Sequence, residues 1–177
     1  MKSYSTKKLI IYAMFVAMFF VLSIYGTVNL GNMKITLQNI PLLMAAFLFG
    51  PLGGAFVGGL GMLLNQLLSQ YGITVTTPLW ILPHIICGAY VGALSHRKKF
   101  GPDNKFALAS IIISSLLILT IFNTLALFID SKIFGYYSAA FVFGSLLMRL
   151  VTAIVSGIIY TLILPPIIKK LEMHYGL

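Results

Sequence analysis

The chain has 177 residues, of which 59% are hydrophobic and only 8% charged, and its formal net charge is +9. Because an ordinary soluble domain carries about 25% charged residues, this composition excludes a soluble globular protein. The positive balance would suggest nucleic-acid binding in a soluble protein, but here the basic residues lie at the ends of apolar segments and indicate membrane topology. We therefore expect one membrane domain over residues 1–177 and no nucleic-acid partner.

Six apolar segments follow one another along the chain, separated by polar, glycine and proline residues. A membrane-spanning helix needs about 20 mostly apolar residues, and most of the segments approach or exceed that length. The second segment is short for a full crossing and is expected to be tilted or partly buried. The predicted fold is an all-α integral membrane protein, a six-transmembrane-helix bundle with spans at about 9–26, 39–50, 52–70, 79–95, 106–130 and 138–168.

The first span follows a basic stretch, M-K-S-Y-S-T-K-K, which would also suit a secretory signal peptide. No Ala-x-Ala cleavage pattern follows Ser23, and more membrane sequence comes soon afterwards, so the segment is predicted to remain as a span. Ala13 and Ala17 lie four residues apart within it and therefore share one face of the helix. Small residues on one face let another helix approach closely. Taken alone, this pattern favours packing between the protein's own helices.

The basic residues predict the orientation of the six spans. If the spans alternate, nine of the twelve Lys and Arg residues fall on one side, two fall on the other, and Arg149 lies within a span. Because cytoplasmic loops are enriched in Lys and Arg, both termini and the loop between the fourth and fifth spans are assigned to the cytoplasm. The connection over residues 27–38 is then the longest outer loop, long enough to cover a site as a lid.

Arg149 lies in the apolar run G-S-L-L-M-R-L-V-T-A of the last span. If that span enters the membrane near Ser138, Arg149 lies about 16 Å deep, at about 1.5 Å per residue. A charge at that depth costs at least about 2.5 to 3.5 kcal/mol, so the side chain should face the protein interior, water or an anion. A structural role would need a buried acceptor, for which Asp130 is the nearest acid in sequence order. Recognition of an anion is the favoured interpretation.

Polar and aromatic side chains from several spans are predicted to lie near the depth of Arg149. Each has an ordinary alternative, because amides can bond between helices, Trp and Tyr can form an interfacial belt, and a histidine can bond a backbone carbonyl. Together they predict an outward-open pocket for a small, partly aromatic solute with a carboxylate or other anionic group. The candidate substrate-binding residues are Arg149, Asn123, Gln66, Asn65, His84, Trp80, Tyr71, Thr77, Ser145, Gln38 and Tyr136.

The sequence lacks the residues that several other mechanisms require. Proton-coupled carriers usually use intramembrane carboxylates, yet the acidic residues lie between the predicted spans or at their ends. There is no His-Glu-x-x-His motif and no cysteine cluster, so neither a metal site nor a catalytic residue is predicted, and the chain is not expected to be an enzyme. Cys87 is expected to be a small packing residue. Without a nucleotide-binding motif the chain needs no cofactor of its own, and energy must come from a partner.

Several motifs resemble those of the substrate-binding membrane subunits, or S-components, of energy-coupling factor (ECF) vitamin transporters. They are A-M-F-V-A in the first span, F-L-F-G-P-L-G-G-A-F-V-G-G-L-G between spans two and three, T-T-P-L-W-I-L-P opening span four, F-N-T-L-A-L in span five and M-R-L in span six. The resemblance covers essentially the whole chain. It implies a multi-pass subunit of a prokaryotic plasma membrane that captures a vitamin outside and topples in the membrane to release it inside.

The resemblance also implies partners and a substrate. The partners are a transmembrane scaffold subunit, which an Ala-x-x-x-Ala pattern like Ala13 and Ala17 contacts, and two cytoplasmic ATPases that use ATP. F-N-T-L-A-L with M-R-L is most similar to the folate-type branch, although Met148 stands where that branch has proline before the arginine. Pantothenate, a hydroxymethylpyrimidine and a pyridoxine-like compound stay open as substrates. A different class of protein, a stand-alone small anion channel or facilitator in which Arg149 selects anions, also stays open.

Overall fold

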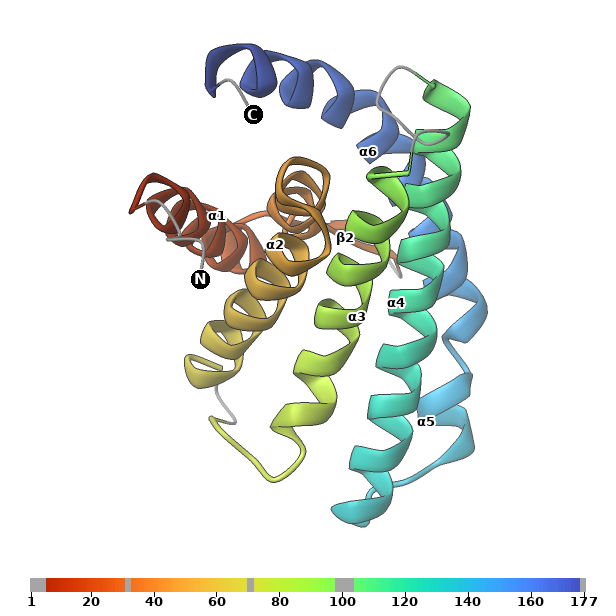
Figure 1. Ribbon diagram of the computed structural model, residues 1–177. Coiled ribbons are helices and arrows are strands. Elements are labelled where there is room, and N and C mark those ends of the chain that lie inside the picture. The colour runs from red at the N-terminus through yellow and green to blue at the C-terminus, as the bar shows by residue number, and fades with distance from the viewer. Residues whose placement is uncertain (1–5, 31–32, 70–71, 98–103, 176–177) are drawn as a thin grey trace.

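The protein is a helical membrane bundle, seen in a computed structural model that describes residues 6–30, 33–69, 72–97 and 104–175 (Figure 1). Within these ranges five helices are long and apolar enough to cross a membrane, which confirms a multi-pass membrane protein. Predicted and observed ends of the first, fourth and fifth spans agree within about three residues. The elements are α1 (Thr6–Tyr25), β1 (Thr27–Leu30), β2 (Met33–Thr36), α2 (Asn39–Leu67), α3 (Thr77–Ser95), α4 (Lys105–Ile133), α5 (Ala139–Phe143) and α6 (Leu146–Tyr175).

α2 contains both the short second segment and the third segment, and a sharp break at Gly50 divides them. Gly50 has φ 76° and ψ −164°, a conformation that essentially only glycine adopts. A Cβ on Gly54 would lie 2.7 Å from the Cβ of Ala46, and one on Gly58 would lie 2.7 Å from the Cδ1 of Leu42. The two halves of α2 therefore run antiparallel as a helical hairpin. The short segment forms much of the buried core, as its length predicts.

A row of glycines brings α2 and α3 into close contact, and we call it the glycine seam. At three levels a glycine of one helix lies against the backbone of the other, pairing Gly54 with Gly88, Gly50 with Gly92 and Gly58 with His84. A Cβ on Gly88 would lie only 2.3 Å from the carbonyl oxygen of Gly54, closer than real Cβ atoms approach. The two backbones can meet at this distance only because side chains are absent.

The predicted outer loop over residues 27–38 folds largely as an antiparallel β-hairpin of β1 and β2. Thr27 pairs with Thr36, and Leu30 pairs with Met33. This small hairpin was not predicted within the loop, although the runs T-V-N-L and M-K-I-T contain the β-branched residues that favour strands. The hydroxyl of Tyr160 in α6 donates a hydrogen bond to the carbonyl of Thr36, which tethers the hairpin to α6.

The predicted last span is divided between α5 and α6. Gly144 follows the last residue of α5, and the backbone N–H of Arg149 donates to the carbonyl of Ser145 over 3.0 Å at the start of α6. Arg149 therefore lies in the first turn of a helix, and the assumption of eleven helical residues between it and Ser138 is wrong. The apolar run conceals the break, since glycine and serine are common in membrane helices.

α6 also continues beyond the predicted end of the last span and changes direction on the way. Pro165 and Pro166 lie inside it, and each removes a backbone donor from the helix. Figure 1 shows the C-terminal part of α6 turned across one end of the bundle. Leu164 before the prolines and Ile168 after them are buried, while Lys169 is exposed. The turned segment therefore closes one end of the core with its apolar side.

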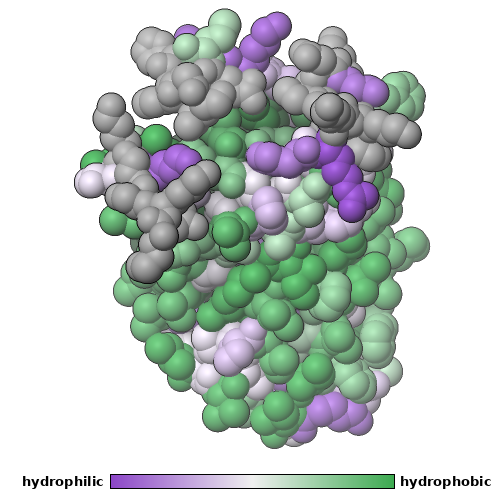
Figure 2. Space-filling model, in the orientation of Figure 1, coloured by the Kyte–Doolittle hydropathy of each residue, from purple (hydrophilic) through white to green (hydrophobic). Residues whose placement is uncertain are grey.

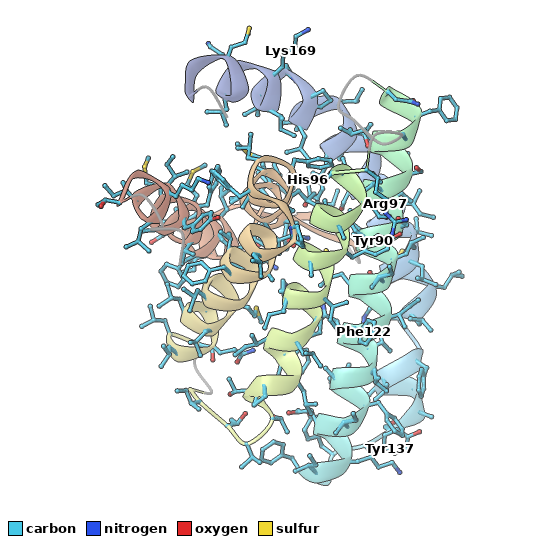
Figure 3. All side chains as sticks on the ribbon, viewed as in Figure 1. Tyr90, His96, Arg97, Phe122, Tyr137 and Lys169 are labelled. Carbon is cyan, nitrogen blue, oxygen red and sulfur yellow. The ribbon has the colours of Figure 1, made fainter. Side chains whose placement is uncertain are left out.

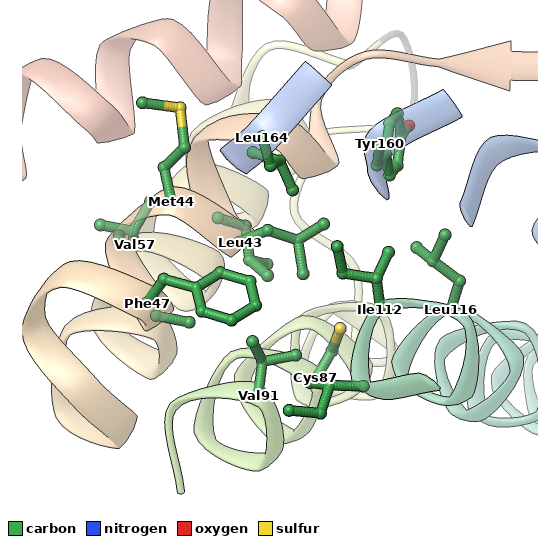
Figure 4. Packing of buried hydrophobic residues seen from close by; sticks show 14 of the residues in the cluster. Leu43, Met44, Phe47, Val57, Cys87, Val91, Ile112, Leu116, Tyr160 and Leu164 are labelled. Carbon is green, nitrogen blue, oxygen red and sulfur yellow. The ribbon is translucent and has the colours of Figure 1, made fainter. Parts of the chain in front are cut away.

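The core lies between α2, α3, α4 and α6, as Figure 4 shows. Cys87 is fully buried there, in agreement with its predicted role as a packing residue. Hydrophilic residues lie toward the two ends of the molecule, with a hydrophobic band between them (Figure 2). Lys169 lies at one end and Tyr137 at the other, and Arg97 lies nearer to the end with Lys169 (Figure 3). This distribution is the one expected of a protein that crosses a bilayer.

Candidate ligand-binding site

A cavity of about 640 Å³ lies among α2, α3, α4, α5 and α6. Small-molecule sites typically have volumes of about 300 to 1,000 Å³. Leucine and methionine side chains form much of the wall, and Trp80, Phe141 and Tyr160 add aromatic surface. Thr36 at the end of β2 also lines the cavity, so the hairpin borders the site. The cavity has the size and the mostly apolar wall of a site for one small organic molecule.

Six of the eleven predicted substrate-binding residues line this cavity. They come from chain segments far apart in sequence, which meet because α3 and α6 both pack against α4 and the end of β2 packs against α6. The sequence analysis grouped these residues because they were expected to lie at a similar depth in the membrane. The six are Gln38, Trp80, His84, Asn123, Ser145 and Arg149.

Two predicted amides of α2 lie outside the cavity lining. The side chain of Asn65 donates a hydrogen bond to the Oγ of Ser23 over 2.5 Å and so joins α2 to α1. Gln66, the next residue, is half-buried and is absent from the lining. Asn65 therefore has the interhelical bond that was the ordinary alternative for such an amide. The predicted Tyr71 lies outside the described residues.

Two further candidates, Thr77 and Tyr136, belong to a polar cluster at the end of α4, outside the cavity lining. The Oγ1 of Thr77 accepts a hydrogen bond from the backbone N–H of Thr74 over 2.8 Å. The carboxylate of Asp130 accepts hydrogen bonds from the hydroxyls of Thr76 and Tyr136. These contacts tie the loop before α3 to the end of α4. Both candidates thus have partners that account for them structurally.

Arg149 has no ion-pair partner among the residues that the structure describes. Asp130, the only acidic residue with a described side chain, is bonded by the two hydroxyls named above. The Arg149 side chain is half-buried and lines the cavity. Its position in the first turn of α6 adds the partial positive charge of a helix N-terminus. The cavity therefore has one strongly electropositive wall whose N–H donors can bond a ligand.

Three buried polar atoms in the described part of the chain lack a hydrogen-bond partner, and all three belong to residues that line this cavity. They are the Oδ1 atoms of Asn39 and Asn123 and the Nε2 of His84. Nδ1 of His84 lies 3.3 Å from the carbonyl oxygen of Trp80, so Nδ1 carries the proton and Nε2 of the neutral ring is an acceptor. Buried polar groups are nearly always bonded. Hydrogen-bond donors on a ligand in the cavity would satisfy these acceptors.

Sequence reasoning missed several polar residues of the lining, among them Asn39 and three on α6. Thr152, Ser156 and Tyr160 follow Arg149 at intervals of three or four residues, which places them on one face of the helix. That spacing is visible in the sequence and would have identified them as neighbours of the arginine. Asn39 carried a weaker signal, because it directly follows the predicted Gln38.

A comparison with protein families gives a match that is consistent with a membrane bundle around a small-molecule cavity. Residues 3–172 match a family described as "ECF-type riboflavin transporter, S component". The match covers nearly the whole chain and confirms the resemblance to S-components, which are membrane subunits for vitamin uptake. It does not confirm the similarity to the folate-type branch. The chain therefore belongs to the family of ECF-type riboflavin transporter S components.

Proposed function

We propose that the chain is the substrate-binding subunit of an ECF importer and that its substrate is riboflavin. The observation that carries this proposal is the set of unpartnered acceptors on Asn39, His84 and Asn123 around a mostly apolar cavity. The family description names riboflavin, and the chemistry of the cavity supports it independently. Folate, the earlier lead, has less support on both grounds.

Riboflavin carries the groups that this lining lacks. Its ribityl chain has several hydroxyls and its ring system has an imide N–H, all of which can donate to the three acceptors. The ring carbonyls can accept from the guanidinium of Arg149. The flat aromatic rings can pack against the side chains of Trp80 and Phe141 and against the apolar wall. Every unsatisfied group of the site thereby has a chemical counterpart in one ligand.

An uncharged ligand can also satisfy Arg149, because the guanidinium donates hydrogen bonds to carbonyl oxygens as well as to anions. Arg149 is the single cation of the lining. Folate would bring two carboxylates into this site, and a buried charge without a partner is costly. Carboxylates supply no donors to Asn39, His84 or Asn123. The expected anionic solute is therefore replaced by a neutral, hydroxyl-rich aromatic molecule, with Arg149 as a hydrogen-bond donor to carbonyl oxygens.

Transport by this subunit requires the ATP-driven module that the family implies. Ala13 and Ala17 are exposed on α1, which supports their assignment to the scaffold contact. Lys169 lies at one end of the bundle and Arg97 lies nearer to that end than to the other, so we assign this side and both termini to the cytoplasm. The two halves of α2 count separately among the six segments. A scaffold subunit and two ATPases would drive release inside.

The test begins with the purified protein and whatever small molecule accompanies it, identified by mass spectrometry. Riboflavin is then titrated into ligand-free protein while flavin fluorescence and the emission of Trp80, the only tryptophan of the chain, are recorded. Saturable riboflavin binding, with no competition from folate or pantothenate, is expected. Saturable folate binding without riboflavin binding would overturn the proposed substrate. Riboflavin flux through vesicles that contain this chain alone would instead favour the facilitator.

A further inference from the structure

A contact between two aromatic rings connects the cavity to α1, a helix that contributes no residue to the lining. The ring of His84 in α3 meets the ring of Phe19 in α1 edge to face, with centroids 5.7 Å apart and an interplanar angle of 85°. Phe19 is 0% exposed and His84 is 2% exposed, so the two rings pack directly against each other inside the protein. A change in the position of one ring must therefore be taken up by the other.

α2 leaves the space through which these rings meet. A Cβ on Gly61 would lie 2.5 Å from the Cδ1 of Phe19, and one on Gly58 would lie 2.6 Å from the carbonyl oxygen of His84. Phe19 thus packs against the bare backbone of α2 on one side and the imidazole of α3 on the other. The contact is as tightly confined as the glycine seam beside it.

The His84 ring is only partly held by the protein. Nδ1 lies 3.3 Å from the carbonyl oxygen of Trp80, which is a long hydrogen bond, and Nε2 is buried without a partner. A ligand donor at Nε2 would add a second bond at the opposite edge of the ring. Occupation of the cavity would therefore restrict the ring that packs against Phe19.

Phe19 lies on the face of α1 opposite to the exposed alanine Ala17. Residues two apart on a helix point about 200° apart, so Phe19 points inward while Ala17 points outward from the same turn. α1 packs mainly against α2, and the Phe19 ring adds a contact to α3. A shift of Phe19 is therefore transmitted to the outward face of α1.

We propose that His84 is a positioning residue that couples ligand occupancy of the cavity to the packing of α1 through Phe19. The proposal rests on the riboflavin site described above. Coupling free energies are reciprocal, so if the ligand alters the packing of Phe19, a change of Phe19 alters the affinity for the ligand. Phe19 does not line the cavity, which makes its effect on affinity a direct measure of the coupling.

The experiment is a double-mutant cycle on riboflavin affinity, measured by fluorescence titration. Phe19→Leu is expected to weaken riboflavin binding roughly fivefold to tenfold in the wild-type background. This loss corresponds to a typical coupling energy between two residues in contact, here Phe19 and His84. Phe15→Leu is the matched control, because Phe15 is another buried phenylalanine of α1 but packs against Phe49. His84→Phe keeps a ring beside Phe19 and removes the Nε2 acceptor, so Phe19→Leu should have no further effect on affinity in that background.

Three results decide between the outcomes. Equal affinity losses for Phe19→Leu and Phe15→Leu, or an undiminished effect of Phe19→Leu beside His84→Phe, would overturn the coupling while leaving the riboflavin site intact. Absence of riboflavin binding by the wild-type chain would overturn the proposed substrate and this inference with it. If Phe19→Leu does not give folded protein, Phe19→Met replaces it with the same expected pattern.

Discussion

Replacement of Arg149 by glutamine is expected to weaken riboflavin binding without unfolding the protein. The guanidinium lines the cavity and has no ion-pair partner among the described residues, so its donors are available to a carbonyl of the ligand. A hydrogen bond to a charged group contributes about 1.5 to 3 kcal/mol. Since each 1.4 kcal/mol is about a factor of ten in Kd, the affinity should fall about 10- to 150-fold. Removal of an unpaired, half-buried charge should leave thermal stability unchanged or slightly higher.

The assay is a fluorescence titration with riboflavin, accompanied by thermal unfolding of the ligand-free protein. Arg97→Gln is the matched control, because Arg97 is exposed and does not line the cavity. The reasoning fails if Arg149→Gln binds riboflavin as tightly as the wild type, or if Arg97→Gln loses as much affinity. Riboflavin is uncharged, so its affinity should also be nearly independent of salt concentration, whereas an anionic ligand would bind more weakly as salt rises.

Three further variants test other parts of the structure. Gly88→Ala should destabilise the fold by about 1 to 3 kcal/mol or more, seen as a lower melting temperature, because its Cβ would lie 2.3 Å from the carbonyl oxygen of Gly54; an unchanged melting temperature would contradict the seam. Asp130→Asn should cost about 1.5 to 3 kcal/mol of stability, because an amide has one acceptor oxygen and cannot accept from both Thr76 and Tyr136, and riboflavin affinity should be unchanged. Ala17→Trp should leave riboflavin binding intact and abolish uptake in cells with the ATPase module; normal uptake would exclude that face as the scaffold contact.

Hydropathy and segment length predicted most of the fold, because burial in a bilayer imposes long apolar helices. The reversal of the chain at Gly50 lies where the predicted second and third segments meet, because glycine and proline interrupt the apolar run there. The break in the last predicted span was not predicted. The interruption after Gly144 was concealed by the apolar run around it, so the continuous helix assumed between Ser138 and Arg149 was wrong. Short strands such as β1 and β2 fall below the length that a hydropathy window resolves.

The candidate site was predicted where polarity is conspicuous in an apolar sequence. Arg149, His84 and Asn123 stand out for that reason, and the structure brings them to one cavity. The direction in which a polar side chain points depends on helix rotation, which the sequence does not determine. Asn65 therefore seemed equivalent to Asn123, yet it points to α1 and bonds Ser23.

The glycine seam also determines where the chain can change in length. The three contacts of the seam can form together only while the contacting residues are separated by equal numbers of residues on α2 and on α3. One inserted residue between Gly50 and Gly58 would rotate the rest of α2 by about 100° and press a side chain onto the backbone of α3. An insertion after Leu68, beyond the end of α2, leaves the spacing on both helices unchanged. The seam thus fixes the register of α3 against α2, and this register places His84 opposite Gly58 and beside the cavity.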